Sequence, residues 1–396
     1  MKKLNIYVCL ITEESESLWH RQITWSLQAM GHSVFTSQQL PLRQSWLTPY
    51  KYWGEEQKVN LTQLIIDDVK KEHANAGIDL FFCYLFDFQF KPFLFTELEK
   101  VGIPSLYFFC DNFSHPQIAR DYAPSATLNW VPEWKATEQF KQSKSKYIYL
   151  PMAANPQLNF PLDTTLNEDV TFIGSKNNYR GNILKSIIDN GYPLKIYGDN
   201  WVPSSGSFHD LEGNNKPTAS EYKSLPFKEQ LQRFIYWRKQ SIKYQISKRL
   251  NPQSKPTNNI SEFDFSEHTN KELLDWKTMN EYTFKAKVCL GINDKFITDA
   301  NGTPCNYMKM RDFEAAMSGA CYLTQNTPES EWHFHEGHEV MRYTYPEEML
   351  EKLSFLLKNE NFRNKLKINI RARALKDHTW ESRFNEAFKA LNLLPQ

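Results

Sequence analysis

The stretch IDLFFCYLFDFQFKPFLFTELEKVGIPSLYFFC, residues 78–110, has the pattern of a strand, a helix and a second strand. Residues 78–86 and 103–110 are short apolar runs rich in strand-forming side chains, and residues 93–102 between them have helical spacing. Strands that are apolar along their whole length, joined by helices, indicate a parallel sheet covered on both faces. The segment therefore predicts a doubly wound α/β domain.

The same alternation extends in both directions from this segment. Before it, residues 4–11 and 32–37 predict strands, and residues 18–31 predict a helix that ends at a glycine. Further elements are expected after it, namely a strand at 127–132, a helix near 133–143 and an extended segment at 147–156. Together these elements form a first domain over residues 1–152.

A second series of strands and helices then begins, and it defines a second domain over residues 153–380. Strands are expected at 169–175, 194–201, 286–293, 321–324 and 337–344, and helices at 180–192, 312–318 and 346–359. Two doubly wound domains in tandem place a cleft between them, at the carboxyl ends of both sets of strands. Ligands bind at that edge of open α/β sheets.

The bulk composition is that of a two-domain globular protein. The chain has 396 residues, more than one compact core usually holds, and 41% of them are hydrophobic. The formal charge of +1 excludes nucleic-acid binding by the field of the whole molecule, so any basic surface must be local. The six cysteines contain no CxxC pair, and five lie in apolar runs, as buried reduced cysteines do.

No segment predicts insertion into a membrane. The apolar runs are too short to cross a bilayer. Residues 4–11 contain Asn5 and run directly into acids without a small-residue cleavage site, so they predict a first strand rather than a signal peptide. A cytoplasmic protein is expected, with peripheral contact at the inner face of the membrane as an alternative.

Residues 202–280 interrupt the second domain with a polar sequence rich in Asn, Ser, Lys and Pro. Within this insertion, residues 227–250 predict an amphipathic helix with a strongly basic face. Such a helix can lie on an anionic membrane or bind a polyanion. It can equally pack on the domain with its basic face in solvent, and the sequence leaves both interpretations open.

Glycine turns at the ends of two expected strands indicate an anion site. Gly174 and Ser175 end one strand shortly before a helix that is expected to begin near Arg180. Free N–H groups and the helix dipole favour an anion there, and an arginine can pair with a phosphate. Tyr197 and Gly198 form a second such turn on the neighbouring strand. One glycine at a strand end is often only a turn, but two together favour a shared pocket.

The segment KMRDFEAAMSGACYLT, residues 309–324, places a carboxylate near the start of a small-residue helix. Glu314 is expected in the first turn of this helix, where the dipole alone would stabilise it. A carboxylate there can also accept two hydrogen bonds from a vicinal diol such as ribose. Lys309 and Arg311 add positive charge for a diphosphate. A nucleotide explains this cluster better than other ligand classes do.

Several motifs of the second domain occur in the order of a known family. They are R-x-F-E-A at 311–315, G-A at 319–320, E-G-H-E-V at 336–340, P-E-E-M at 346–349 and H-T-W-x-x-R at 378–383. In these motifs the chain resembles the C-terminal domain of the CgeB-like glycosyltransferases, which belong to the GT-B group. The segments DVTFIGS, IYGDNW and YLPMAANP are similar to less distinctive parts of the same family.

The resemblance implies a two-domain GT-B enzyme that moves a sugar from a nucleotide-sugar donor to an acceptor. The donor would lie on the second domain, with its ribose on Glu314 and its diphosphate near Gly174, and the acceptor would lie mostly on the first domain. The resemblance implies no metal or other cofactor, because basic side chains and helix N-termini neutralise the leaving diphosphate in this architecture. The final helix, 381–396, would cross back onto the first domain.

One position departs from the family pattern. Many retaining members carry a second glutamate eight residues before the ribose carboxylate, where this chain has Asn306. The stereochemical outcome therefore stays open. The same departure keeps open a protein that binds a sugar nucleotide or a carbohydrate without turning it over. The histidines at 333, 335 and 338 have no matching acid or cysteine pattern, so no metal site is expected there.

An inverting enzyme needs a general base on the first domain, within reach of the acceptor hydroxyl. Asp111 and His115 follow a strand end that should face the cleft, and Asp111 is the preferred candidate. Glu13 and His20, after the first strand, are further candidates on the acceptor side. The structural alternatives are an Asx turn at Asp111 and a turn histidine at His115.

The sequence therefore predicts a glycosyltransferase whose acceptor is a glycan, a lipid-linked sugar or another cell-surface precursor. A nucleic-acid acceptor is an alternative within the same architecture, and the near-neutral charge argues against it. Peripheral membrane or polyanion binding through residues 227–250 is a third role that the sequence leaves open.

Overall fold

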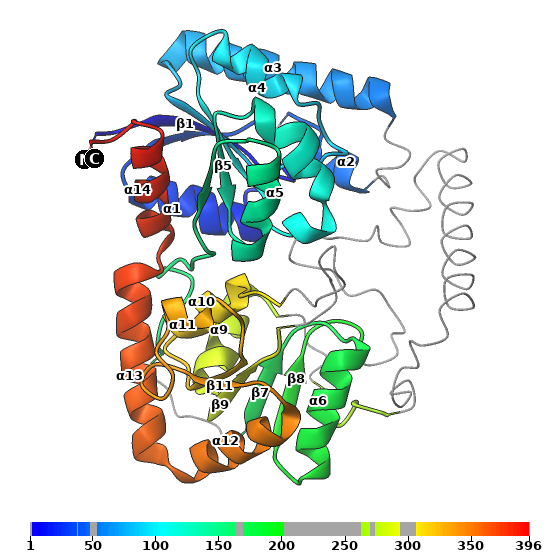
Figure 1. Ribbon diagram of the computed structural model, residues 1–396, viewed down its shortest axis with the longest axis vertical. Helices are drawn as coiled ribbons and strands as arrows, with labels where there is room; N and C mark the ends of the chain where they lie inside the picture. Colours follow the sequence, from blue (N-terminus) through cyan, green and yellow to red (C-terminus); the bar gives the residue numbers. More distant parts are fainter. Residues whose placement is uncertain are drawn as a thin grey trace.

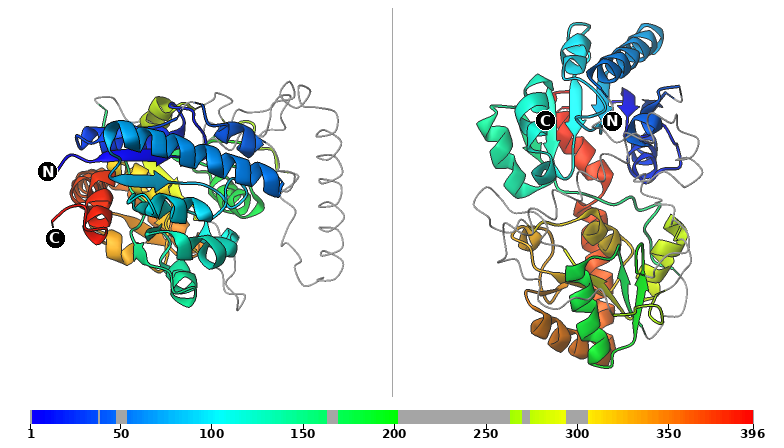
Figure 2. Two further views of the ribbon diagram at one scale, coloured as in Figure 1. Left: turned by 90° about the horizontal axis from the view of Figure 1, so that it is seen from above. Right: turned by 90° about the vertical axis from the view of Figure 1, so that its right-hand side faces the viewer.

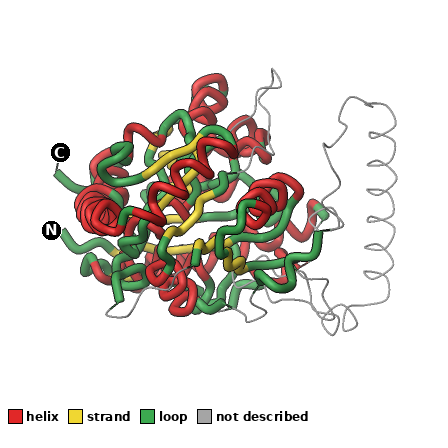
Figure 3. The backbone as a smooth tube through the Cα atoms, turned by 90° about the horizontal axis from the view of Figure 1, so that it is seen from below, coloured by secondary structure: helices red, strands yellow, loops and turns green. Residues whose placement is uncertain are grey.

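Two parallel sheets form the cores of two domains, one in each half of the chain (Figure 1). The computed structural model describes residues 2–37, 39–47, 54–162, 169–201, 263–269, 274–293 and 306–395. Strands lie inside and helices lie outside, as the tube in Figure 3 shows. The predicted α/β architecture of two doubly wound domains is confirmed.

The first sheet contains six parallel strands in the order β2-β1-β3-β4-β5-β6. Its strands are β1 (Asn5–Cys9), β2 (Ser33–Phe35), β3 (Leu80–Cys83), β4 (Ser105–Phe108), β5 (Leu128–Val131) and β6 (Tyr147–Tyr149). Every residue of β3, β4 and β5 is buried, because helices cover both faces of these central strands. The all-apolar runs at 78–86 and 103–110 are therefore the sequence pattern of strands in the middle of the sheet.

Helices of the first domain lie on the two faces of this sheet (Figure 1). They are η1 (His20–Thr24), α1 (Trp25–Ala29), α2 (Leu42–Leu47), α3 (Glu55–Ala76), α4 (Phe93–Glu99) and α5 (Thr137–Gln142), with short turns η2 (Asn112–Ser114), η3 (Ile118–Tyr122), η4 (Ala123–Ser125) and η5 (Trp134–Ala136). The 22-residue helix α3 was not among the predicted elements. The helix predicted at 18–31 begins instead as a π-helical turn, η1, which continues into α1.

The second sheet contains five parallel strands in the order β11-β10-β9-β7-β8. Its strands are β7 (Val170–Ile173), β8 (Leu194–Tyr197), β9 (Val288–Gly291), β10 (Tyr322–Gln325) and β11 (Met341–Tyr343). The helices are α6 (Asn178–Asp189), α9 (Trp276–Lys285), α10 (Met310–Met317), α11 (Ser330–His333), α12 (Pro346–Lys358), α13 (Glu360–Asp377) and α14 (Trp380–Ala390). All five strands fall within the ranges expected from the sequence, to within one residue at the end of β10.

The chain crosses between the domains twice, and the two crossings lie side by side. Ala154 on the first crossing donates its N–H to the carbonyl of His378 on the second (3.1 Å), and Ala154 forms a parallel bridge with Thr379. Helix α13 runs along the second domain and α14 continues along the first (Figures 1 and 2). The ring of Phe384 on α14 lies 5.6 Å from the ring of Phe82 on β3. The last helix thus forms part of the first domain's core.

The end of the predicted insertion is part of the second domain. The ring of Phe265 is buried 5.1 Å from that of Trp201, and the carbonyl of His268 accepts from the N–H of Ile196 on β8 (2.7 Å). Helix α9 packs against β7. The end of the insertion, predicted at residue 280, is therefore too late, because these contacts hold the end of this polar sequence against the sheet. The basic helix predicted at 227–250 lies outside the described residues.

Two bulk predictions can be compared with the structure. Cys9, Cys83, Cys110, Cys289 and Cys321 are free and buried, as predicted, whereas Cys305 lies outside the described residues. Within the described ranges, no helix combines the length and the apolar composition needed to cross a bilayer.

Candidate active site

Helix α10 carries the carboxylate that the sequence singles out, and its own first turn fixes where it begins. The Asp312 side chain accepts a hydrogen bond from the backbone N–H of Lys309 (2.7 Å), which caps the helix before Met310. The helix therefore begins two residues earlier than predicted. Glu314 lies in the second turn, not in the first, so the prediction that the helix dipole acts on it from the first turn is wrong.

Asp312 is a buried structural acid that the sequence analysis missed. Its Oδ1 accepts hydrogen bonds from the hydroxyls of Tyr322 (2.9 Å) and Thr324 (3.0 Å) on β10, and from the amide of Asn293 (3.3 Å) after β9. Burial raises the pKa of Asp312, and these hydrogen bonds oppose the rise. The result is that α10 is anchored over the ends of β9 and β10. A carboxylate three residues into a helix is the sequence signal that could have identified it.

Glu314 lies at the boundary between the two domains and is only 3% exposed. Its Oε1 accepts a hydrogen bond from Nε2 of Gln22 in the first domain (3.2 Å), and its Oε2 lies 3.4 Å from Nη1 of Arg311. Arg311 also donates to the hydroxyl of Thr283 on α9. The carboxylate is therefore held from both sides, by one group from each domain.

Two guanidinium groups near Glu314 have a buried Nε that retains hydrogen-bonding capacity. Nε of Arg311 and Nε of Arg21 are buried and have no hydrogen-bond partner in the described part of the chain. Glu314 acts electrostatically on Arg21, which places the two side chains near each other across the domain boundary. Buried N–H donors without an acceptor cost free energy, and an anionic ligand would remove that cost.

The predicted base Asp111 makes a second contact between the domains. It follows β4 in the left-handed backbone conformation (φ 64°), which aspartate tolerates better than most residues. Its Oδ1 accepts a hydrogen bond from the hydroxyl of Tyr307 in the second domain (2.7 Å). The ammonium of Lys309 lies 3.3 Å from the centre of the Tyr307 ring. Lys309 thus lies beside the predicted base.

A second acid, Glu133, lies beside Asp111 and was not predicted. Glu133 follows β5 and is buried, and its carboxylate accepts hydrogen bonds from the backbone N–H of Asn112 (3.0 Å) and from its side-chain amide (2.7 Å). Burial, and then the charge of Asp111, raise the pKa of Glu133 to about 8. No motif identified this residue, because the contact depends on the pairing of β4 with β5.

His115, the second predicted catalytic residue, lies beside Asp87. Its Nδ1 is 3.8 Å from the carboxylate of Asp87, and its ring lies among the rings of Phe86 and Phe109. Burial lowers the pKa of His115, although the charge of Asp87 opposes this. These apolar neighbours favour neutral imidazole at physiological pH.

The glycine turns predicted to hold a diphosphate pack tightly on each other. Gly198 has φ 124°, and a Cβ there would lie 2.5 Å from the carbonyl oxygen of Gly174. Nη1 of Arg180 donates to the carbonyl of Ser175 (2.8 Å). Tyr197 stacks on a tyrosine of α9 with ring centres 4.4 Å apart. These five residues form one turn cluster at the ends of β7 and β8, and their donor role stays a prediction.

The two acceptor-side candidates have protein partners. Glu13 accepts a hydrogen bond from the backbone N–H of Arg43 (2.7 Å). The ring nitrogens of His20 lie 3.2 Å from the hydroxyl of Thr24 and 3.0 Å from the carbonyl of Thr12. Burial lowers the pKa of His20. Both ring nitrogens are therefore used within the first domain.

Asn306, at the position that departs from the family pattern, is buried at the start of the segment that leads into α10. Its amide nitrogen donates to the carbonyl of Asn326 (3.1 Å), and its Oδ1 has no partner within the described ranges. Among the described residues, no three His, Cys, Asp or Glu side chains lie together as metal ligands would.

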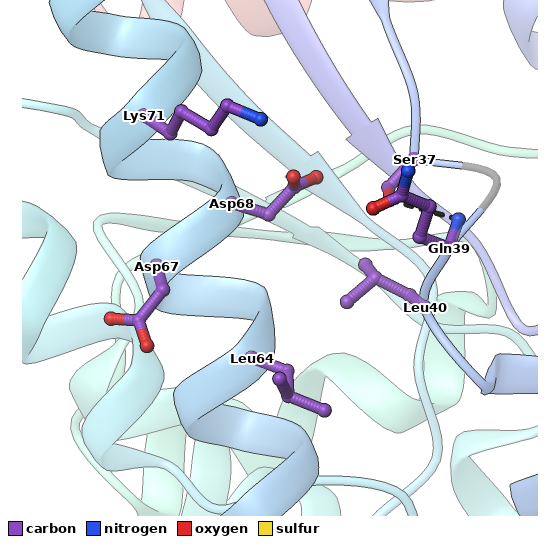
Figure 4. Close-up of a pocket in the computed structure, with 7 residues that line it drawn as sticks. All are labelled: Ser37, Gln39, Leu40, Leu64, Asp67, Asp68 and Lys71. Carbon is purple, nitrogen blue, oxygen red and sulfur yellow. Dashed lines mark hydrogen bonds between the residues drawn. The ribbon is translucent and has the colours of Figure 1, made fainter.

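A cavity of about 290 Å³ lies elsewhere in the first domain, between α3 and the segment after β2 (Figure 4). It is lined by Ser37, Gln39, Leu40, Leu64, Asp67, Asp68 and Lys71. Asp68 also accepts a hydrogen bond from the hydroxyl of Tyr7 on β1. The lining contains none of the candidate site residues, so this cavity is separate from the candidate active site.

Part of the second domain matches a known protein family. Residues 259–389, which include Arg311 and Glu314, match a family described as glycosyl transferase-like. No curated protein matches the sequence significantly.

Solved structures of similar fold cover almost the whole chain. Sucrose-phosphate synthase from Thermosynechococcus elongatus aligns over 99% of this chain and 100% of its own, with 11% identity and a TM-score of 0.59. HepE from Anabaena, in complex with UDP and glucose, aligns over 99% and 100%, with 11% identity and a TM-score of 0.56. A glycosyltransferase from Rickettsia africae aligns over 98% of each chain, with 10% identity and a TM-score of 0.57.

The protein has the GT-B fold, in which two Rossmann-like domains are joined in tandem. The family match over the second domain and this fold together support a glycosyl-transfer enzyme.

Proposed function

We propose that the protein transfers a sugar from a nucleotide-sugar donor to an acceptor hydroxyl, with the donor on the second domain. The observation that supports this most directly is the environment of Glu314. Among the described residues, each oxygen of its carboxylate has one protein donor, and a carboxylate oxygen has about two acceptor directions. One direction on each oxygen is left for the two hydroxyls of a ribose.

The unpaired guanidinium donors support an anionic group beside that ribose. Nε of Arg21 and Nε of Arg311 would pair with the diphosphate, and Lys309 would add positive charge as the nucleoside diphosphate leaves. UDP is the first nucleotide to test, because HepE, of similar fold, is known in complex with UDP. The glycine turn at Gly174 remains the second proposed diphosphate contact.

In an inverting reaction, Asp111 would accept the proton of the acceptor hydroxyl while that oxygen bonds to the anomeric carbon and the nucleoside diphosphate departs. Asp111 is the proposed base because it lies at the domain boundary, held by Tyr307 beside Lys309. The acceptor that we propose is a glycan, a lipid-linked sugar or another cell-surface precursor.

Donor binding tests the nucleotide site. Glu314→Ala and Arg311→Ala should each weaken UDP binding about tenfold or more, because each removes a hydrogen bond to a charged group. Isothermal titration with UDP measures this, and Glu351→Ala, an exposed acid of α12, is the control. If both variants bind UDP with wild-type affinity, Glu314 and Arg311 are not part of the donor site.

Turnover tests the base separately from the donor. Asp111→Asn should leave UDP binding unchanged but lower UDP release from UDP-glucose by at least about a hundredfold. Asp121→Asn, on the exposed surface near the same loop, is the control. Full turnover in Asp111→Asn would exclude it as the base. UDP binding without turnover in the wild type would favour a binding protein, which the loss of the glutamate at Asn306 keeps as the second candidate.

A further inference from the structure

Gln22 lies where both domains and both interdomain crossings meet. It belongs to the π-helical turn η1 and is 1% exposed. Its Oε1 accepts hydrogen bonds from the backbone N–H of Asn155 on the first crossing (3.1 Å) and from the indole N–H of Trp380 on the second (2.8 Å). Its Nε2 donates to Glu314 (3.2 Å).

These partners permit only one orientation of the Gln22 amide. Asn155 and Trp380 present N–H donors, so the group facing them must be the amide oxygen. The NH₂ group then faces the carboxylate of Glu314. A reversed amide would place hydrogens against hydrogens and an oxygen against a carboxylate. The direction of the Gln22 donor is thus fixed by the crossings, not by Glu314.

Glu314 in turn depends on Gln22 for one of its two fixed contacts. Arg311 holds Oε2 from within α10, and Gln22 holds Oε1 from the other domain. A diol needs both oxygens in one plane and in one direction, since its two hydroxyls are rigidly spaced. Without Gln22 the carboxylate can rotate about its last side-chain bond. The ligand must then fix the carboxylate when it binds, and the entropy lost in doing so weakens the affinity.

We propose that Gln22 is a positioning residue for the donor site, which fixes Glu314 for the ribose diol. Gln22 is itself held by Asn155 and Trp380, so the positions of the two crossings determine how Gln22, and through it Glu314, is oriented toward the nucleotide. Donor affinity and the relative position of the domains are thereby coupled. This inference rests on the proposed function and adds the residue by which the first domain contributes to ribose recognition.

The test compares a ribonucleotide with its 2′-deoxy counterpart. Gln22→Met keeps the length of the side chain and removes the donor. It should weaken UDP binding by up to about tenfold, the upper end of the entropic cost of fixing one side chain, and weaken 2′-deoxy-UDP binding less, because that ligand contacts Glu314 through one hydroxyl only. Isothermal titration of both ligands measures the ratio of their dissociation constants. Gln28→Met, on the exposed side of α1, should leave both affinities unchanged.

A second variant guards against loss of folding. Trp380→Phe keeps an aromatic ring in the core but removes the indole N–H that orients the Gln22 amide. It should also reduce the ratio of UDP affinity to 2′-deoxy-UDP affinity, by a smaller factor than Gln22→Met does. A merely structural defect would weaken both ligands equally.

Several outcomes would overturn the inference. Unchanged UDP affinity in Gln22→Met, or equal losses for UDP and 2′-deoxy-UDP, would show that Gln22 does not position the diol-binding group. Tighter UDP binding would show that Gln22 blocks Glu314 instead of orienting it. These outcomes leave the proposed function intact, provided Glu314→Ala still loses UDP. A wild-type protein that binds none of UDP, GDP, CDP, ADP and dTDP would instead overturn the proposed function, and this inference with it.

Discussion

Glu133 is a buried acid whose pKa is raised by burial and by the charge of the candidate base Asp111. Burial and the neighbouring charge of Asp111 raise its pKa to about 8, against an ordinary value of about 4.3 for a glutamate. The folded protein therefore keeps a proton on Glu133 over a range in which the unfolded chain has lost it. Under the linkage relation, stability falls as pH rises from about 4.3 to about 8.

Replacing Glu133 by Gln should remove this pH dependence. The amide oxygen can still accept a hydrogen bond from Asn112, and no charge has to be buried at high pH. We expect Glu133→Gln to melt above the wild type at pH 8.5 and close to it at pH 5. Thermal unfolding at the two pH values measures this, with Glu138→Gln on the exposed side of α5 as the control. The same difference in Tm between Glu133→Gln and the wild type at both pH values would contradict the raised pKa of Glu133.

At the scale of elements, the end of β9 shows why α10 sits where it does. Gly291 ends β9, and a Cβ there would lie 2.2 Å from the hydroxyl of Tyr322 and 2.4 Å from that of Thr324. These two hydroxyls hold the carboxylate of Asp312 at the start of α10. A side chain on β9 would therefore push away the groups that anchor the helix.

Gly291→Ala is expected to destabilise the protein by about 1–3 kcal/mol, the usual range for overpacking a core. The same change should weaken UDP binding, because displacement of Asp312 moves α10 and with it Glu314. Chemical unfolding and UDP titration measure the two effects. Gly54→Ala is the control, since its Cβ would meet only the flexible end of Gln57. Unaltered stability in Gly291→Ala would show that the two hydroxyls can move without cost.

At the scale of the whole molecule, Arg383 joins α14 to both interdomain crossings. Its Nε donates to the carbonyl of Pro151 (3.0 Å), Nη1 donates to the carbonyl of Asp377 (2.7 Å), and Nη2 lies 2.8 Å from Nδ1 of His378. Burial lowers its pKa to about 10, which still leaves the guanidinium charged at neutral pH. One side chain thus holds together the segments that connect the domains.

Arg383→Ala should therefore lower stability by roughly 3 kcal/mol or more, because it leaves buried acceptors without a donor. For a 396-residue chain that unfolds as one unit, this corresponds to a fall in Tm of about 4 °C or more. Calorimetry measures it, and Lys389→Ala, which removes an exposed cation from the same helix, should change Tm little. A similar Tm in both variants would mean that the crossings are held by their backbone contacts alone.

Most strands and the two domains were predictable, because all-apolar runs and helical spacing are local properties of consecutive residues. Helix α3 was missed although its buried residues have helical spacing, at Leu61, Ile65, Ile66 and Val69. The predicted insertion was extended into α9 because that sequence is polar. Arg311 and Glu314 were chosen by their motif, and their donor-site role stays a prediction. The turn predicted for Glu314 was wrong by one, since Asp312 caps the helix earlier.

Residue order within each segment was thus sufficient for the strand–helix alternation and for locating the helix that carries Glu314, whose role in ligand binding stays a prediction. It could not reveal that Gln22 and Glu314, 292 residues apart, form one hydrogen bond, or that Tyr307 and Asp111, 196 residues apart, form another. The acid Glu133 became visible only when β4 and β5 were paired. The first two contacts arise from the docking of two domains, and the Glu133 contact arises from strand pairing within one domain. No local pattern in a chain encodes which of its distant polar groups will be buried against each other.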